Sequence, residues 1–411
     1  MKNEAATCPM PRWLSIIGIG EDGIDGLSAM AKRLVASAEL VVGGARHLAM
    51  ADVLIAGRRL PWSSPLDTTL QDIAGHRGRA VVVLASGDPF HYGIGRQLAA
   101  LASPEEFICL PQPSAYSLAA ARLGWSLQDV ALVTLHGRAL EGVIGHLQPG
   151  AKILTLSWDA ATPAKLAALL AARGMGGSRL TVLEAMGGPR ERLRSTIAAE
   201  FDFDAIDPLN TVAIEVVCAP GAMTLPFTPG LDDSCFESDG QLTKREIRAI
   251  TLSALAPRHG ELLWDVGLGA GSVAIEWLLR HPSLRAIGIE ARADRADRAA
   301  RNAASLGTPD LQIVQGDAPA ALHGLATPDA VFIGGGMGDD GVFDAVWRAL
   351  RPGGRLIVNA VSVETESILA DRFREHGGEL IRLQVTKADR VGAMYGWRPA
   401  MPVTQWRVQK P

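Results

Sequence analysis

The sequence has 411 residues, 48% of them hydrophobic and 20% charged, which is typical of a globular protein long enough for two domains. Its formal net charge of −4 argues against a surface built to bind nucleic acid or an anionic membrane. We expect reduced thiols and no metal, because the four cysteines are scattered without the spacing of a zinc site (Cys8, Cys109, Cys218 and Cys235). The N-terminus lacks an apolar signal-peptide core, and no apolar run is long enough to span a membrane, so we expect a cytoplasmic protein.

The first half of the chain alternates apolar runs with segments of helical spacing, which predicts an α/β domain. Strands are predicted at 13–19, 40–42, 80–85, 130–135, 152–156 and 211–218, and helices at 27–38, 94–101 and 163–172. From Pro220 to Gly240 the sequence has three prolines, three glycines, three aspartates and little periodicity. We therefore predict a linker at 221–240 between domains at 12–220 and 241–411.

A second α/β pattern fills the C-terminal half. It begins with a predicted helix at 243–255, for which Thr243 would be the N-cap and Glu246 the partner in a capping box. A doubly wound sheet is predicted from strands at 262–266, 286–290, 311–315, 330–333, 355–360, 378–385 and 403–408. Arginines between Arg292 and Arg301 are interleaved with Asp294 and Asp297, which indicates a solvated helix face.

The strongest motif is a glycine loop between the first strand and helix of this second pattern. It is Asp265-Val266-Gly267-Leu268-Gly269-Ala270-Gly271, or DxGxGxG. Glycines let a ligand approach the backbone, and the following helix offers free N–H groups. A dinucleotide-binding loop would need glycine or alanine where Ser272 stands, which disfavours an NAD(P)-dependent oxidoreductase. The pattern resembles the first motif of the class I S-adenosylmethionine-dependent methyltransferases, which implies cofactor contacts from Asp265, Gly267, Gly269 and Gly271.

This resemblance implies cofactor contacts at the ends of successive strands. Glu290 would accept the ribose hydroxyl protons, and Asp317, followed by Ala318, would face the adenine. A helix cap before Pro319 is the alternative role for Asp317. Gly334 begins a glycine run where methyltransferases of nucleobase amino groups carry an Asn/Asp-Pro-Pro-aromatic segment, so a nucleic-acid substrate is disfavoured.

The N-terminal half has its own signature. A strand ends in Ile17-Gly18-Ile19-Gly20, and a later strand leads into Ser86-Gly87-Asp88-Pro89, with Tyr92-Gly93 shortly after. This order resembles the tetrapyrrole methylases, or class III methyltransferases, whose next element is similar to residues 111–117. The resemblance implies cofactor contacts from Gly18, Gly20, Gly87, Asp88, Pro89, Ser114 and Ser117, although a plain turn and a plain helix entry are the alternatives. Arg46 or His47 could meet a substrate carboxylate or face solvent.

A class III domain followed by a class I domain is similar to the precorrin-6Y C-5,C-15-methyltransferase (decarboxylating) family of cobalamin biosynthesis. The similarity runs from about Trp13 to the end and includes residues 236–246. It implies two S-adenosylmethionine sites, one per domain, with Thr243 in the second, and no metal. It also implies that the first domain methylates C-5 of a corrin precursor, and that the second methylates C-15 and decarboxylates the ring C acetate, giving precorrin-8X. Class III domains are commonly dimers, so a homo-oligomer is expected.

No Ser/His/Asp or Cys/His arrangement is found, and no catalytic residue is predicted. A sulfonium-activated methyl group and a nucleophilic carbon mainly need alignment. A carboxylate-rich substrate needs basic and aromatic partners, for which the candidates are Lys244, Arg245, Lys387, Arg390, Tyr395, Trp397 and Arg398. Two alternatives remain: a methyltransferase of another small molecule with a degenerate N-terminal half, and a nucleic-acid modification enzyme with an N-terminal binding module.

Overall fold

The computed structural model describes residues 12–411, so Cys8 lies outside the described part. The chain divides into two compact units: the first ends at Met223, and the second comprises Thr224–Pro411 with residues 141–147. In the described part, no helix combines the length and the apolar character needed to cross a membrane. The three described cysteines are unbridged.

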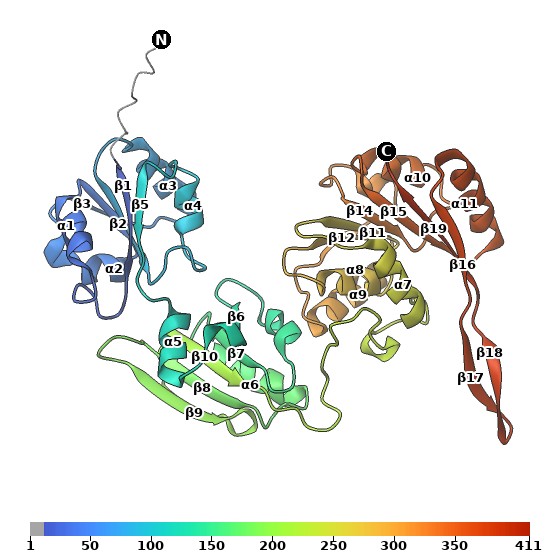
Figure 1. The fold of residues 1–411 in the computed structure, drawn as a ribbon, viewed down its shortest axis with the longest axis horizontal. Coiled ribbons are helices and arrows are strands. Elements are labelled where there is room, and N and C mark those ends of the chain that lie inside the picture. The colour runs from blue at the N-terminus through green and yellow to red at the C-terminus, as the bar shows by residue number, and fades with distance from the viewer. Residues whose placement is uncertain (1–11) are drawn as a thin grey trace, which may run out of the picture. The chain divides into compact units, whose positions relative to one another are not determined.

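The first unit begins with a five-stranded parallel sheet (Figure 1). The strand order is β3 (Arg58–Pro61), β2 (Leu40–Gly43), β4 (Val81–Ser86), β1 (Leu14–Ile19) and β5 (Phe107–Leu110). Side chains from α1 (Ala29–Ser37) and α2 (Ala45–Met50) join the apolar core on one face, and those from α3 (Leu66–Gly75) and α4 (Gly95–Ala99) join the core on the other. Burial on both faces explains the unbroken apolar runs of β1 and β4.

A second sheet follows in the same unit and is mixed. The strand order is β6 (Val130–Thr134), β7 (Lys152–Leu156), β10 (Asn210–Glu215), β8 (Arg179–Glu184) and β9 (Arg192–Ile197). Only β6 and β7 pair in parallel, and the other neighbours are antiparallel. Helices α5 (Ala115–Leu123) and α6 (Thr162–Ala172) accompany it. Strands β3, β5, β8 and β9 were not predicted.

The second unit is built on a seven-stranded sheet with helices on both faces (Figure 1). The strand order is β13 (Gln312–Gln315), β12 (Arg285–Glu290), β11 (Leu262–Val266), β14 (Ala330–Ile333), β15 (Arg355–Ala360), β19 (Val403–Gln409) and β16 (Glu379–Leu383). The first five strands are parallel, and β19 is antiparallel to both neighbours. The helices are α7 (Arg245–Leu255), α8 (Ser272–Leu278), α9 (Ala293–Ser305), α10 (Val342–Ala349) and α11 (Val363–His376). The predicted doubly wound α/β sheet is confirmed.

A two-stranded hairpin interrupts the end of this unit. Strands β17 (Thr386–Val391) and β18 (Met394–Pro399) pair with each other and with no other strand of residues 12–411, and they extend away from the sheet (Figure 1). Nearly every residue of the hairpin is exposed, including Met394, Tyr395 and Trp397. The sequence indicated basic and aromatic residues here but not this secondary structure.

Candidate functional site

The DxGxGxG loop lies at the carboxyl end of β11, just before α8. Gly267, Gly269 and Gly271 have φ values of +77°, +57° and +79°, a region that glycine adopts without strain. A Cβ on Gly267 would lie 3.0 Å from the backbone N and O of Gly335, so this glycine is also required by close packing. A Cβ on Gly269 would meet only the Gly267 carbonyl oxygen, at 3.9 Å. The loop therefore leaves open space at Gly269, which fits an approaching ligand.

Glu290 ends the neighbouring strand and turns its carboxylate toward the loop. One oxygen accepts a hydrogen bond from the Gly269 N–H at 2.8 Å, and the other accepts one from the Arg292 N–H at 3.0 Å. The residue is only 5% exposed. Each carboxylate oxygen has a second lone pair, so Glu290 can still accept ribose hydroxyl protons while it orders the loop.

Asp265 lies beneath the loop, within β11. Its Oδ2 accepts a hydrogen bond from the Ala274 N–H at 3.0 Å, which caps the first turn of α8. Burial, together with the charge of Glu290, raises the pKa of Asp265 to about 7, although the bond from Ala274 opposes this shift. The structure thus gives Asp265 a role in shaping the loop.

The other predicted residues stand at the ends of the flanking strands. The Gly316 N–H donates to the Glu290 carbonyl at 2.9 Å, and Asp317 follows with an exposed side chain. A helix cap is not its role, because the next helical turn is capped at Pro319. The Gly334 N–H donates to the Val266 carbonyl at 3.1 Å. The predicted residues, with Ala318, therefore lie together at the carboxyl ends of four adjacent parallel strands, where ligands of such sheets bind.

The predicted capping box at Thr243 is wrong. Helix α7 begins at Arg245, its N-cap is Lys244, and none of the described side chains caps it. The Thr243 carbonyl accepts a hydrogen bond from the buried Arg248 guanidinium, which fixes the chain one residue before the cap. Glu246 pairs with Lys387 at 3.1 Å instead.

That ion pair brings two groups of predicted substrate residues together. Lys387, in β17, lies beside the start of α7, where Lys244 and Arg245 are exposed. The remaining candidates are spread along the exposed hairpin: Arg390, Tyr395, Trp397 and Arg398, the last of which pairs with Asp389 at 3.3 Å.

The sequence predicted that the arginine-rich face of α9 is solvated, but two of its arginines are largely buried. The side chains of Arg295 and Arg298 are 19% and 18% exposed, and both contact the Asp239 carboxylate, at 2.8 and 3.4 Å. Asp239 precedes α7, so this helix face binds the segment between the first unit and α7. Among the described residues, no group of three or more His, Cys, Asp or Glu side chains could hold a metal ion.

In the first unit the three predicted turns meet through their backbones. A Cβ on Gly18 would lie 2.0 Å from the Gly87 carbonyl oxygen and 2.5 Å from the Gln112 nitrogen. The Gln112 N–H donates to that same carbonyl at 3.1 Å, and the Gly87 N–H donates to Ile19 at 3.2 Å. The sequence order of these motifs thus corresponds to one cluster at the carboxyl ends of β1 and β4.

Polar side chains of this cluster shape its turns. Asp88 accepts from the Phe90 N–H at 2.9 Å, and Ser114 caps α5 by accepting from the Ser117 N–H at 3.2 Å. Gly20 lies in the turn after β1, and Pro89 lies in the turn after β4. These contacts fit the alternative structural roles and leave the cofactor roles as predictions.

Arg46 and His47 lie beside these turns. Arg46 pairs with Glu21, directly after Gly20, and lies 3.4 Å from the Ser86 hydroxyl. His47 Nε2 is 3.0 Å from the same hydroxyl. Burial, followed by the charge of Arg46, lowers the pKa of His47 to about 4, so the imidazole is neutral at physiological pH. Of the two, only Arg46 carries positive charge at this place.

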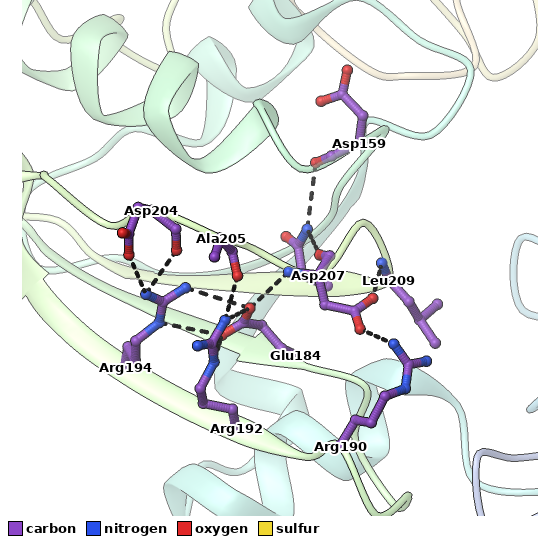
Figure 2. A network of polar contacts seen from close by, with 10 residues as sticks. Asp159, Glu184, Arg190, Arg192, Arg194, Asp204, Ala205, Asp207 and Leu209 are labelled. Atoms are coloured by element: carbon purple, nitrogen blue, oxygen red, sulfur yellow. Dashed lines mark hydrogen bonds and ion pairs between the residues drawn. The ribbon is translucent and has the colours of Figure 1, made fainter.

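An arginine cluster that the sequence analysis missed continues from Glu21. Arg190 contacts Glu21 at 3.4 Å and also pairs with Asp207. Beside it, Arg192 and Arg194 bind the fully buried Glu184 (Figure 2). Burial alone would raise the pKa of Glu184, but the bonds from Arg192 and from the Asp207 N–H hold it below its usual value. The sequence signal that could have revealed this cluster is the presence of arginine at three alternate positions, Arg190, Arg192 and Arg194.

The family comparisons agree with both motif sets. Residues 14–202 match the Tetrapyrrole (Corrin/Porphyrin) Methylases family, and residues 234–410 match the Precorrin methyltransferase domain family. A precorrin-6Y C(5,15)-methyltransferase [decarboxylating] from Sinorhizobium sp is 55% identical over 394 residues, which is 96% of this chain and 95% of that protein. The chain belongs to the precorrin-6Y C(5,15)-methyltransferase (decarboxylating) family. Methyltransferase domains of these families imply the use of S-adenosylmethionine.

Two shorter relatives each match less than half of the chain. A probable cobalt-precorrin-6B C(15)-methyltransferase (decarboxylating) from Saccharolobus solfataricus is 33% identical over 39% of this chain and 82% of that protein. A cobalt-precorrin-7 C(5)-methyltransferase from Salmonella typhimurium is 29% identical over 47% of this chain and 96% of that protein. Their names assign one methylated carbon to each, and decarboxylation only to the C(15) protein.

Proposed function

We propose that the chain carries two methyl-donor sites, one in each unit, and transfers two methyl groups to a corrin precursor with loss of one CO₂, giving precorrin-8X. The observation that carries this proposal is the presence of two separate clusters of glycine turns, each at the carboxyl ends of parallel strands. When bound, S-adenosylmethionine supplies a methyl group already activated by its sulfonium.

In the second unit, Gly267, Gly269 and Gly271 would admit the donor to the backbone, and Glu290 would hold its ribose. Asp317, with Ala318, would flank the adenine, and Thr243 and Gly334 would border the site. The open space at Gly269 and the remaining lone pairs on Glu290 support this arrangement. We assign methylation of C-15 and decarboxylation to this unit, because the shorter relative named for C(15) is also the one named as decarboxylating.

In the first unit, Gly18, Gly20 and the Gly87-Asp88-Pro89 turn would contact the second donor, with Ser114 and Ser117 beside them. The backbone approach of Gly18 to Gly87 leaves no room for side chains between these turns. We assign C-5 methylation to this unit. A separate relative named for C(5) alone supports a division of labour between the two units.

Neither unit needs a nucleophilic side chain, and none is proposed. The chain's contribution is to align the donor with the carbon, to exclude water and to pair basic groups with the substrate's carboxylates. Arg46 in the first unit and Lys244, Arg245 and the hairpin residues Arg390, Tyr395 and Arg398 in the second are the proposed substrate partners. We also propose a homo-oligomer, because class III domains are commonly dimers. Location in the cytoplasm and absence of a metal remain predictions.

The test is mass spectrometry of the product formed from the corrin precursor. The unaltered chain should add two methyl groups and release one CO₂. Gly269→Arg should abolish decarboxylation and one methyl transfer while retaining the other, because the new side chain fills the space reserved for the donor. Retention of both transfers and of decarboxylation would contradict the assignment of the loop.

The matched control is Gly260→Arg. Gly260 has a φ of +79°, and a Cβ there meets nothing within 4 Å, so the backbone strain and the added side chain are similar. It lies just before the amino end of β11, at the opposite end of this strand from the glycine loop. This variant should form the complete product.

A further inference from the structure

Buried polar side chains join the glycine loop of the second unit to the segment before α7. We call residues 230–243 the lead-in segment. Glu276, on α8, accepts hydrogen bonds from the N–H groups of Gly230 and Leu231, at 2.6 and 2.9 Å. Arg248, fully buried on α7, donates to Glu276 and to the carbonyls of Leu231 and Thr243. The lead-in segment is therefore fixed to two helices of this unit by a buried ion pair.

Asn302, on α9, makes the most direct link to the loop. Its Oδ1 accepts from the Glu237 N–H at 2.8 Å, and its Nδ2 donates to the Glu237 carbonyl at 3.0 Å and to the Ala270 carbonyl at 2.9 Å. Both N–H donors of the amide are used, and the side chain is 1% exposed. A flipped amide would face its oxygen toward two carbonyls, so the orientation is fixed.

The same helix supports the loop at the next residue. A Cβ on Gly271 would lie 3.2 Å from the Ala299 side chain, one turn of α9 before Asn302. Ala270 stands between Gly269, which faces the open space, and Gly271, which rests on α9. The Asn302 amide therefore holds the Ala270–Gly271 peptide group, next to the position at Gly269 where the proposed donor would lie.

We infer that Asn302 is a positioning residue for the methyl-donor site of the second unit, acting by joining the lead-in segment to the glycine loop. The inference rests on the proposed function of this site. Because Asn302 binds both segments, any effect of donor binding at the loop on the ordering of the lead-in segment is matched by an equal effect of that ordering on donor binding. The lead-in segment is then part of the donor site, and its conformation affects methyl transfer by the second unit.

The test uses Asn302→Asp in the full chain. The aspartate keeps the acceptor for the Glu237 N–H but places a second oxygen against the carbonyls of Glu237 and Ala270. Hydrogen exchange, followed as S-adenosylhomocysteine is added, reports each site separately through peptides containing Gly269 or Gly87. We expect the concentration for half-protection at Gly269 to rise about fivefold or more, since the substitution leaves buried polar groups without a hydrogen-bond partner. The value at Gly87 should not change.

Arg301→Gln is the matched control. Arg301 is the neighbouring residue and binds the Glu237 side chain at 2.8 Å, in an exposed ion pair that contributes little. In Arg301→Gln, the S-adenosylhomocysteine concentration that gives half-protection at Gly269 should stay within about twofold of the value for the unaltered chain. A purely structural role for Asn302 would lower the unfolding temperature of Asn302→Asp without changing half-protection at Gly269, and that result would overturn the inference.

The unaltered chain provides a second measurement that does not depend on the folding of a variant. S-adenosylhomocysteine should slow exchange of the Glu237 amide together with those of the loop. Protection of the loop without any effect at Glu237 would also overturn the inference. Absence of loop protection at every concentration would overturn the proposed function of this site, a distinct result that removes the basis of the inference too.

Discussion

Asp265 is a carboxyl group whose ionisation depends on the fold. Its pKa is about 7 in the folded chain, because of burial first and the Glu290 charge second, but about 4 in an unfolded chain. Between these values the folded state binds a proton that the unfolded state has lost. The free energy of unfolding of the second unit should therefore fall as pH rises from about 4 to about 7, by at most about 1.4 kcal/mol per pH unit.

Asp265→Asn should remove this decline. The asparagine oxygen can still accept from the Ala274 N–H, and the side chain does not titrate. Denaturant unfolding at pH 5 and pH 8 should show the variant gaining stability relative to the unaltered chain at the higher pH. Asp310→Asn, which changes an exposed carboxyl group of the same unit, should leave the difference between the two pH values unaltered. An equal pH dependence in all three chains would contradict the shift.

At the scale of the elements, the close contact between β1, β4 and the turn before α5 requires that Gly18 has no side chain. Gly18→Ala would place Cβ 2.0 Å from the Gly87 carbonyl oxygen, and neither strand can move without losing its pairing. We expect a loss of stability of about 1–3 kcal/mol or more and loss of S-adenosylhomocysteine binding by the first unit. Thermal unfolding and hydrogen exchange at Gly87 would measure both.

Gly75→Ala is the control for this prediction. Gly75 ends α3, and a Cβ there meets nothing within 4 Å, so alanine should be tolerated or slightly stabilising. Wild-type protection at Gly87 in Gly18→Ala would show that the close approach of these turns is not needed for the site.

The elements that could be predicted are those whose own sequence specifies them. Strands β1, β4 and β11 are buried on both faces, so their apolar runs and glycine turns are visible in the sequence. Strand β9 was missed because its arginines, Arg192 and Arg194, bind the buried Glu184, a contact made only in the fold. The capping box at Thr243 failed for a similar reason, because Arg248 competes for its backbone. Asn302 looked like an ordinary helix residue, since its partners are distant backbone groups that no local pattern indicates.

For the whole molecule, the proposed donor site in each of the two compact units predicts two independent binding events in one chain. Isothermal titration calorimetry should therefore give two S-adenosylhomocysteine molecules per chain. A ligand that binds only the folded state at 100 times its Kd stabilises that state by about 2.7 kcal/mol, so saturation should raise the unfolding transition of both units.

Single substitutions should remove one of the two binding sites at a time. Gly269→Arg should reduce it to one and leave only the first unit stabilised by ligand, whereas Gly18→Ala should reduce it to one with only the second unit stabilised. Because the units have separate cores, each substitution should leave the other site's affinity nearly unchanged. A stoichiometry of one in the unaltered chain would contradict the two-site proposal, and the unit whose unfolding transition still moved with ligand would then be identified as the donor site for both methyl groups.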